Sequence, residues 1–459
     1  MTRLNDHSPI AVVAMAGVFP GASTLDLFWH NLINKKDACG DIPESRWISR
    51  PADMVSSRPA PDKVFHRRGC VIQNFDFDPD GFAIPADMLR SLDPMYHLVL
   101  HAGREAFSAF QSAAIDKDRI AVILAAIALP TETSSRLAQE ILGESFKNAL
   151  FQKSPEHLSP LTLNQCLASQ VTALPAAVLA QALGLCGPAF TLDAACASSL
   201  YAVKLACDML SSRRCDAVLA GGVSRPDCLY TQVGFSQLRA LSPTGFCAPF
   251  DARADGLVVG EGTGLLVLKR LDDALKDGDT LFGLVRGIGL SNDMRGNLLA
   301  PDSEGQVRAM QAAYQAAGWN PADVDIIECH GAGTPIGDAT ELQSLKLLWE
   351  KTGSKPGRCP IGSVKSMIGH LLTAAGAAGM IKILLAMKHE TLPPSLNFTA
   401  SAENSPLHGS PFRVQTLAEP WHRRDPGVPR RAAISAFGFG GINGHVLLEE
   451  WAPDISLTT

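Results

Sequence analysis

The sequence of 459 residues lacks the features that mark several common classes of protein. No apolar run approaches the roughly 20 residues that a membrane-spanning helix requires. The N-terminal apolar run, Ile10 to Met15, is followed so soon by Gly17 and Pro20 that it does not resemble a signal peptide. A formal net charge of −6 gives none of the overall basic character that dominates binding to a phosphate backbone. We therefore expect a cytoplasmic protein with no membrane span and no nucleic-acid partner.

Several short motifs are also missing. The 11 cysteines include no C-x-x-C pair, so the spacing predicts neither a disulfide framework nor a zinc site, and most of them should be buried thiols. The chain contains no P-loop, no G-x-S-x-G elbow and no H-E-x-x-H helix. These absences exclude the commoner nucleotide-binding, hydrolase and metalloprotease interpretations.

The sequence does contain an alternation of short apolar runs, bounded by Gly or Pro, with Ala-rich and Leu-rich stretches. This pattern is typical of an α/β protein whose sheets are covered by helices. The predicted strands are 10–15, 120–124, 217–220, 262–268, 324–329 and 432–435. The predicted helices are 93–110, 196–211, 306–317, 338–349 and 370–388. The last helix is apolar on most sides, so we expect it inside the protein.

Two strand-turn-helix segments, one around residue 196 and one around residue 370, suggest an internal duplication. We expect a first half at residues 1–250, a second half at 251–452, and a tail or linker start at 453–459. Residues 42–80 have few helix signals and predict a long surface excursion. Residues 131–169 have helical patches without a clear period, and uncertain segments of that size often cover a site or an interface.

Cys196 has the most unusual surroundings of the cysteines. Asp193 and two alanines precede it, and small residues follow it into an amphipathic helix. A sulfur at a helix N-terminus meets unpaired N–H groups and the positive end of the helix dipole, which favour a thiolate nucleophile. Alternatively, Cys196 is a small buried residue in a crowded turn with no chemical role. The local sequence favours neither interpretation over the other.

Two histidines lie where α/β proteins place their sites. His330 follows an apolar strand and opens a glycine-containing turn, and His370 follows Lys365 by five residues in a glycine-flanked segment. Each of them, taken alone, could be a buried histidine that only makes hydrogen bonds within the core. The glycine-rich run 435–445 could bring backbone N–H groups close to a ligand, or could be a tight structural loop; its glycine spacing does not fit a dinucleotide fingerprint.

Taken in order, five motifs over nearly the whole chain resemble the signature set of β-ketoacyl synthases. They are Asp193-Ala-Ala-Cys196-Ala-Ser-Ser, Pro249-Phe-Asp-Ala-Arg-Ala-Asp-Gly, His330-Gly-Ala-Gly-Thr-Pro-Ile-Gly-Asp338, Lys365-Ser-Met-Ile-Gly-His370 and Phe437-Gly-Phe-Gly-Gly-Ile-Asn-Gly-His445. The resemblance implies a thiolase-like fold, with two duplicated α/β halves in five layers, αβαβα. It also implies an acyltransferase that works as a homodimer.

The resemblance also implies roles for individual residues. Cys196 would take an acyl group from the phosphopantetheine thioester of an acyl carrier protein. His330 and His370 would promote decarboxylation of a malonyl thioester, and the resulting carbanion would attack the acyl-cysteine. The amides of Cys196 and Phe439 would form the oxyanion hole, with Phe439 gating the acyl pocket. Lys365 would order the site by pairing with a carboxylate, for which Glu341 is the candidate.

These roles imply no metal and no directly bound cofactor. The segments Phe75-Asp-Phe-Asp and Leu92-Asp-Pro-Met-Tyr-His resemble the multidomain polyketide-synthase branch. Ala195 and Ala197, flanking the cysteine, are closer to iterative microbial lipid synthases, including the polyunsaturated-fatty-acid type. Ala332 and Ile442 also replace usual threonines, which leaves the substrate open.

Three alternative functions compete with this interpretation. A chain-length-factor-like, non-elongating partner subunit usually lacks the cysteine, whereas this chain has it together with both histidines. A coenzyme A-dependent thiolase would need a second reactive cysteine where this chain has Asn443-Gly-His445. A papain-like hydrolase would need neither the lysine–histidine pair nor the five ordered motifs.

Overall fold

The computed structural model describes residues 8–110, 115–151, 174–295 and 300–453. Its main strands are β1 (Ile10–Val18), β4 (Ile120–Ala126), β5 (Ala189–Leu192), β6 (Ala217–Ser224), β7 (Gly262–Arg270), β8 (Gly283–Asn292), β9 (Ile326–Glu328), β10 (Cys359–Gly362), β12 (Phe412–Val414), β14 (Arg431–Gly438) and β15 (Ile442–Glu449). Short pairs are formed by β2 (Gly40–Asp41) with β3 (Arg68–Gly69), and by β11 (Thr391–Leu392) with β13 (Glu419–Pro420). The predicted α/β class is confirmed.

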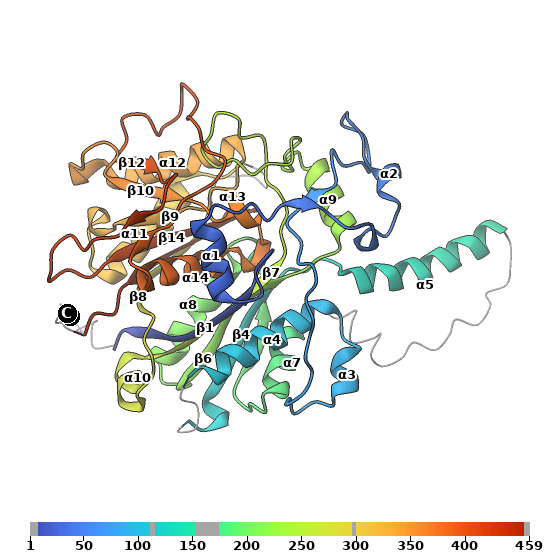
Figure 1. Cartoon of the computed structure of the whole chain (residues 1–459), viewed down its shortest axis with the longest axis horizontal. Coiled ribbons are helices and arrows are strands. Elements are labelled where there is room, and N and C mark those ends of the chain that lie inside the picture. The colour runs from blue at the N-terminus through green and yellow to red at the C-terminus, as the bar shows by residue number, and fades with distance from the viewer. Residues whose placement is uncertain (1–7, 111–114, 152–173, 296–299, 454–459) are drawn as a thin grey trace.

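The helices fill the connections between these strands (Figure 1). They are α1 (Leu25–Ile33), α2 (Pro51–Met54), α3 (Ala86–Arg90), α4 (Pro94–Ser108), α5 (Glu132–Phe151), α7 (Pro175–Ala182), α8 (Ser198–Ser211), α9 (Cys228–Gln237), α10 (Leu271–Asp277), α11 (Ser303–Ala317), α12 (Pro335–Trp349), α13 (Lys365–Ile368) and α14 (Ala375–Lys388). Among the described residues, no helix has both the length and the apolarity needed to cross a membrane.

The predicted duplication is visible in the order of the strands. In the first unit the spatial order is β5-β4-β6-β7-β1, which is 3-2-4-5-1 in chain order. The second unit repeats this order as β10-β9-β14-β15-β8, with the same pattern of parallel and antiparallel neighbours. An antiparallel pairing of β1 with β8 joins the two units.

The point at which the chain passes between the units differs from the sequence expectation. The sequence puts the boundary at residue 250, before β7, because the apolar strand runs look alike in both halves. In the structure β7 pairs with β6 and β1 and so completes the first unit. The second unit begins at β8, after residue 282.

Five layers follow from which helices cover which faces. Helices α4 and α7 pack on the outer face of the first unit's sheet, and α11 and α12 cover the second unit on the opposite side. Helices α8 and α14 lie between the two sheets in a core shared by both units. Every residue of α14 except Lys388 is buried, which confirms the prediction of an internal helix.

Small residues let the two inner helices approach closely. A Cβ on Gly376 of α14 would lie 2.8 Å from the Oγ of Ser199 on α8, and that Oγ accepts a hydrogen bond from the amide of Ala377 at 2.9 Å. The sequence predicts that α14 starts at His370, but it starts at Ala375. Gly369, with φ 69°, and Leu372, with φ 47°, break the chain into short turns before it.

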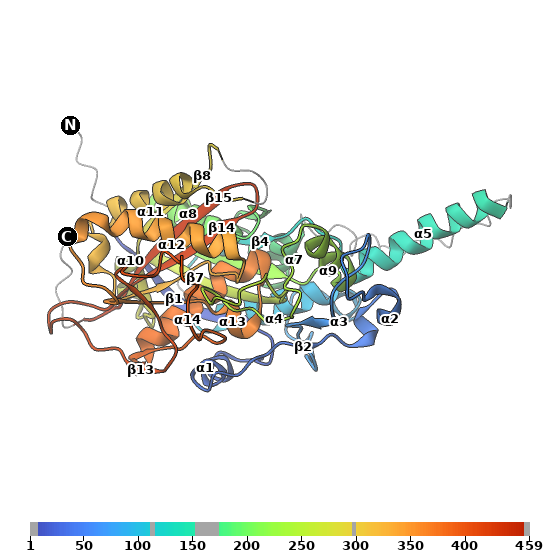
Figure 2. The same cartoon turned by 90° about the horizontal axis from the view of Figure 1, so that it is seen from above.

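Two segments leave the layered body. Helix α5 projects well away from it, which Figure 2 shows from above. The helical patches predicted in this region are part of α5, while residues 152–173 lie outside the described part of the chain. The other segment contains β2 and β3, where Cys39 and Cys70 form a disulfide. The sequence did not predict this bond, because the two cysteines are 31 residues apart and meet only through strand pairing.

Candidate active site

Cys196 lies in the turn between β5 and α8, at the edge of the space between the two sheets. Ala195 adopts a left-handed conformation with φ 49°, which turns the chain sharply at the cysteine. Ser198 fixes this turn, since its Oγ donates to the carbonyl of Ala195 at 2.6 Å and accepts from the amide of Ala194 at 2.7 Å. Asp193 accepts from the amides of Ala195 and Ala128. The acidic residue before the cysteine therefore shapes the turn.

The thiol of Cys196 is buried, with 8% of the residue exposed. Burial raises its pKa to about 11, although the charge of Lys365 and the amide of Phe439 act in the opposite direction. The sequence favours a thiolate because the sulfur precedes helix α8. In the folded chain desolvation outweighs that local effect, so the resting group is a protonated thiol at neutral pH.

His330 lies on the loop after β9 and is half-buried. Its Nδ1 accepts a hydrogen bond from the amide of Phe437 at 3.2 Å. Burial, and then the charge of Lys365, hold the pKa of His330 well below its usual value of 6.5. A neutral imidazole whose Nδ1 is an acceptor carries its proton on Nε2. His330 therefore presents an Nε2–H donor.

His370 lies on a different loop and is also a neutral imidazole with its proton on Nε2. It is 1% exposed, and its Nδ1 accepts from the amide of Leu372 at 3.0 Å. Burial and the charge of Lys365 lower the pKa of His370 well below 6.5. The rings of His330 and His370 lie edge to face with centroids 5.3 Å apart. Two neutral imidazoles thus lie side by side, and within the described residues neither Nε2–H has a hydrogen-bond partner.

The hairpin between β14 and β15 brings the histidines and the cysteine together. Its residue Phe437 contacts His330, and its Gly438 packs on the cysteine turn. A Cβ on Gly438 would lie 3.1 Å from the amide nitrogen of Cys196, so a side chain there would press on the turn. The amide of the next residue, Phe439, is close enough to the thiol to lower its pKa. Gly440 and Gly441 supply the positive φ angles of 83° and 78° that close the hairpin.

Lys365 is the charged centre of the site and is 4% exposed. Its Nζ donates to the carbonyl of His330 at 2.5 Å. Glu341 accepts from the amides of His330 and Gly331 at 2.7 and 2.8 Å. Burial raises the pKa of Glu341 to about 7, although these two amides and the charge of Lys365 act in the opposite direction. Among the described residues, no ion pair within 4 Å joins Lys365 to Glu341. The two residues support the His330 loop from opposite sides.

Sequence reasoning did not assign three further buried charges. Asp338 accepts from the amides of Phe250 and Gly333 at 2.8 and 3.2 Å, and burial raises its pKa to about 7. Lys382 of α14 pairs with Glu328 of β9 at 2.6 Å. An acid at the end of an apolar strand and a lysine in an apolar helix were the available signals. The Glu328 carboxylate also accepts from the amide of Val364, which leads into Lys365.

Comparison with known families identifies this arrangement. Residues 7–274 match the model of the Beta-ketoacyl synthase, N-terminal domain, and residues 282–399 match the Beta-ketoacyl synthase, C-terminal domain. The chain belongs to the β-ketoacyl synthase family. It is a ketosynthase, an acyltransferase of the thiolase-like fold, as the resemblance of its motifs predicts.

Relatives of this ketosynthase include polyketide and lipid synthases. Polyketide synthase PksL of Bacillus subtilis (strain 168) is 35% identical over 97% of this chain and 9% of that protein. A polyunsaturated fatty acid synthase protein of Thraustochytrium sp. is 31% identical over 97% of this chain and 16% of that protein. The chain therefore spans a small part of the length of these curated relatives.

Solved structures cover nearly all of this chain. The PfaC keto synthase–chain length factor structure has a TM-score of 0.89 and 35% identity, covering 98% of this chain and 49% of that chain. The ketosynthase from module 6 of the bacillaene synthase from Bacillus subtilis 168 has a TM-score of 0.82 and 33% identity, covering 97% of this chain and 72% of that chain. The predicted fold, with its N-terminal and C-terminal halves, is confirmed.

Proposed function

We propose that this ketosynthase catalyses a decarboxylative Claisen condensation between an acyl group on Cys196 and a malonyl-type extender. The observation that carries the proposal is the pair of neutral imidazoles, His330 and His370. Each has its Nδ1 occupied by a backbone amide, and its Nε2–H has no partner among the residues that the structure describes, with ring centroids 5.3 Å apart. Two converging donors suit an oxygen on which negative charge develops.

In the loading step, the Cys196 sulfur attacks the thioester carbonyl of an acyl group carried on phosphopantetheine. The Cys196 thiol first gives its proton to water, the new bond to the acyl carbon then forms, and the carbon–sulfur bond to the carrier breaks as the departing carrier sulfur takes up a proton. The amides of Cys196 and Phe439 are the donors for the tetrahedral oxyanion. Both act on the thiol in the free chain, and both lower its pKa.

In the second step, a malonyl thioester loses carbon dioxide and its carbonyl oxygen becomes an enolate oxygen. Hydrogen bonds from the Nε2–H groups of His330 and His370 would stabilise that oxygen. The enolate carbon then attacks the acyl carbonyl on Cys196, and the cysteine sulfur leaves and regains a proton. Neutral imidazoles suit this role because they donate without first having to bind a proton.

Lys365 and Glu341 are positioning residues in this proposal. The Lys365 Nζ holds the carbonyl of His330 while the Glu341 carboxylate holds its amide. The backbone of His330 is thus fixed at both ends of the residue. Burial keeps both imidazoles neutral, and the charge of Lys365 lowers both of their pKa values further.

The substrates follow from this chemistry. We propose that acyl carrier proteins deliver both thioesters on phosphopantetheine, in the cytoplasm, with no directly bound cofactor. Phe439 would gate the acyl pocket. Its ring lies 6.0 Å from that of Phe235 and borders an apolar cluster. That cluster comprises Phe235, Ala240, Leu241, Leu257, Val259, Ala332 and Leu372.

A homodimer completes the proposal. Within the described part of the chain, strand β5, which leads to Cys196, is the last strand of its sheet and pairs on one side only, with β4. Its Phe190 is 37% exposed. An edge strand of this kind can pair with another chain, and a second copy would place its own β5 beside it. The solution mass, measured by sedimentation, should be twice that of one chain.

Three variants test the function. Cys196→Ala should abolish acyl loading, which intact-protein mass spectrometry after incubation with an acyl carrier thioester would record. His330→Ala and His370→Ala should load normally but release carbon dioxide from malonyl carrier protein about 10²–10⁴ times more slowly.

Two matched controls separate these roles from folding. Cys207→Ala removes another buried thiol of the same region, and His445→Gln removes a buried histidine of β15 whose ring packs on Tyr314. Both should retain loading and decarboxylation. If Cys196→Ala still takes up an acyl group, the assignment of Cys196 as the nucleophile is wrong. If both histidine variants release carbon dioxide at the normal rate, the roles of His330 and His370 are wrong.

A further inference from the structure

Residues 38–72, which overlap the surface excursion predicted at 42–80, brace the loop that carries His370. The amide of Ala38 donates to the carbonyl of Met367 at 2.8 Å. Cys70 exchanges backbone hydrogen bonds with Val259 and Glu261 at 2.8 and 3.1 Å. His370 bonds to Val258 and Gly260 at 2.7 and 3.0 Å, on the other side of the same extended segment. Cys70 and His370 therefore flank one short segment, 258–261.

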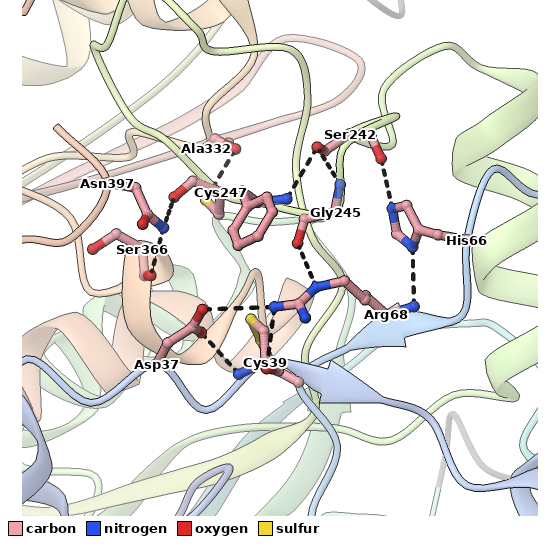
Figure 3. Close-up of a disulfide and its surroundings, with 12 residues drawn as sticks. Asp37, Cys39, His66, Arg68, Ser242, Gly245, Cys247, Ala332, Ser366 and Asn397 are labelled. Atoms are coloured by element: carbon pink, nitrogen blue, oxygen red, sulfur yellow. Dashed lines mark hydrogen bonds and ion pairs between the residues drawn. A yellow bond between two sulfur atoms is a disulfide. The ribbon is translucent and has the colours of Figure 1, made fainter. Parts of the chain in front are cut away.

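The Cys39–Cys70 disulfide fastens this brace. The two cysteines lie next to the β2–β3 pair, which contains only two residue pairs, Gly40 with Gly69 and Asp41 with Arg68. A ladder of that length is weak in water, so the covalent bond carries much of the connection. Figure 3 shows Arg68 reaching from β3 toward Asp37 and the carbonyls of Cys39 and Gly245.

The sulfur of Cys70 packs directly on the residue before His370. Cys70 is fully buried, and a Cβ built on Gly369 would lie 2.8 Å from its Sγ. Cys39, Cys70 and Cys247 form one small cluster with Val258, which we call the cysteine cluster. The Sγ of Cys247 donates to the carbonyl of Ala332, on the loop of His330, at 3.4 Å. The cysteine cluster thus contacts the loops of both histidines.

We propose that Cys39 and Cys70 are a reversible positioning pair for His370. In the disulfide form the pair holds Gly369, and with it the imidazole of His370, in the geometry that serves decarboxylation. Reduction to two thiols releases the loop and slows decarboxylation, whereas loading of Cys196 continues. The inference rests on the role proposed above for His370 and adds a thiol–disulfide control to it.

The physical reason is the space that the two sulfurs need. Bonded sulfurs lie about 2 Å apart, whereas two thiols in van der Waals contact need roughly 4 Å. The Cys70 sulfur has Gly369 on one side, so separation of the pair displaces the His370 loop or opens the β2–β3 pair. Cys39 is half-buried, which gives a reductant access to its sulfur.

The reaction is a balanced two-electron exchange. A cellular thiol attacks the Cys39 sulfur and expels the Cys70 sulfur, which takes up a proton. A second thiol then releases Cys39, leaving two protein thiols and one external disulfide. For the experiment a trialkylphosphine is preferable, because a thiol reagent would cleave the substrate thioesters. The phosphine gains oxygen from water as phosphine oxide, and the hydrogens of that water complete the two thiols.

The test uses the full chain, oxidised with glutathione disulfide and then divided into untreated and phosphine-treated samples. Alkylation and peptide mass spectrometry report the Cys39–Cys70 bond. Carbon dioxide release from malonyl carrier protein should fall about tenfold or more on reduction, because a displacement of about 1 Å in a catalytic group can cost about 10²-fold. Loading of Cys196 should change less than about twofold, and reoxidation should restore release.

Variants make the assignment specific. Cys39→Ser and the double variant Cys39→Ala/Cys70→Ala should release carbon dioxide at the rate of the reduced wild type. Treatment with the phosphine should not change that rate. Cys186→Ser, which removes an exposed free cysteine, should behave as wild type. Cys39→Ser needs no replacement of the fully buried Cys70, so it serves if the double variant does not fold.

Other results would overturn the inference. They are absence of the bond after oxidation, equal carbon dioxide release in both states, or a parallel loss of loading on reduction. His370→Ala, assayed alongside, tells the two ideas apart. If it loses decarboxylation while reduction has no effect, only the positioning pair fails. If it retains decarboxylation, the proposed role of His370 fails first.

Discussion

The two units of the molecule share one strand order but provide different chemistry at equivalent places. In each unit the third strand leads into an inner helix, β5 into α8 and β10 into α14. The first connection contains Cys196 and the second contains His370. In the second unit His330 also lies just after the second strand, β9, whereas β4 is followed by the apolar Ile127. A duplicated scaffold thus places Cys196, the proposed nucleophile, on one copy and the two imidazoles on the other.

The connections that differ most explain how the site is assembled. In the first unit, strands β6 and β7 are joined by a long segment that includes α9 and the residues paired with Cys70 and His370. In the second unit, β14 and β15 are joined by a glycine hairpin that contacts both Cys196 and His330. The long connection covers and braces the site, and the short one links its two halves.

The largest effect should come from the buried charge that distinguishes the inner helices. Helix α14 contains Lys382, 1% exposed and paired with Glu328, whereas the buried positions of α8 are apolar or serine. Lys382→Met should lower the free energy of unfolding by about 3–5 kcal/mol, because it leaves a carboxylate buried without its partner. Chemical denaturation measures the loss.

The double variant Lys382→Met/Glu328→Gln should recover a large part of that stability. The exposed pair of Lys204 and Asp208 on α8 is the control, since its removal should change stability by only about 0–1 kcal/mol. A single Lys382→Met variant as stable as wild type would contradict the assignment of an ion pair at this position.

A smaller effect is expected from the hairpin that joins the halves. Gly438→Ala would place a Cβ 3.0 Å from that of Ala195 and 3.1 Å from the amide of Cys196. We expect acyl loading to slow about 100-fold, equivalent to about 2.7 kcal/mol of activation free energy, because the thiol and its oxyanion donors shift together. Loading followed by mass spectrometry provides the rate.

Gly234→Ala is the matched control for this variant. Gly234 lies within α9, where no atom outside its own helix comes within 4 Å of an added Cβ, so loading should be unchanged. If Gly438→Ala also loads at the wild-type rate, close packing of the hairpin on the cysteine turn is not what positions the thiol.

The same comparison indicates how far sequence alone could reach. The apolar runs predicted the central strands because burial on both faces leaves a local signal, and motif order predicted which residues meet. The break before α14 was missed, since Ala-rich and Leu-rich sequence continues through Gly369 and Leu372, whose backbone angles depend on the folded surroundings. The disulfide depends on strand pairing across 31 residues and the pKa of Cys196 on burial, and neither is a local property.

The smallest effect, measured per pH unit, concerns the different pH dependence expected for the two units. Cys196 has a pKa of about 11, whereas both histidines titrate well below 6.5. At pH 7 about one thiol in 10⁴ is ionised, and the fraction rises about tenfold, or 1.4 kcal/mol, for each pH unit. Acyl loading measured separately should therefore accelerate about tenfold per unit between pH 7 and 9. Decarboxylation, which depends on imidazoles that stay neutral throughout this range, should change less than about threefold.

The stability of the folded protein sets the highest pH at which these rates can be measured. The pKa of Cys196 in the folded chain lies above its ordinary value of 9.0, so burial of the neutral thiol favours the folded state below pH 9. That contribution is lost as the pH rises from 9 toward 11, and assays should stop at pH 9. A loading rate that is flat from pH 7 to 9 would mean that the thiol gives up its proton within the complex as the carrier sulfur departs. If the rates of loading and decarboxylation instead rose equally with pH, one titrating group would control both steps. The proposed difference between the two units would then be wrong.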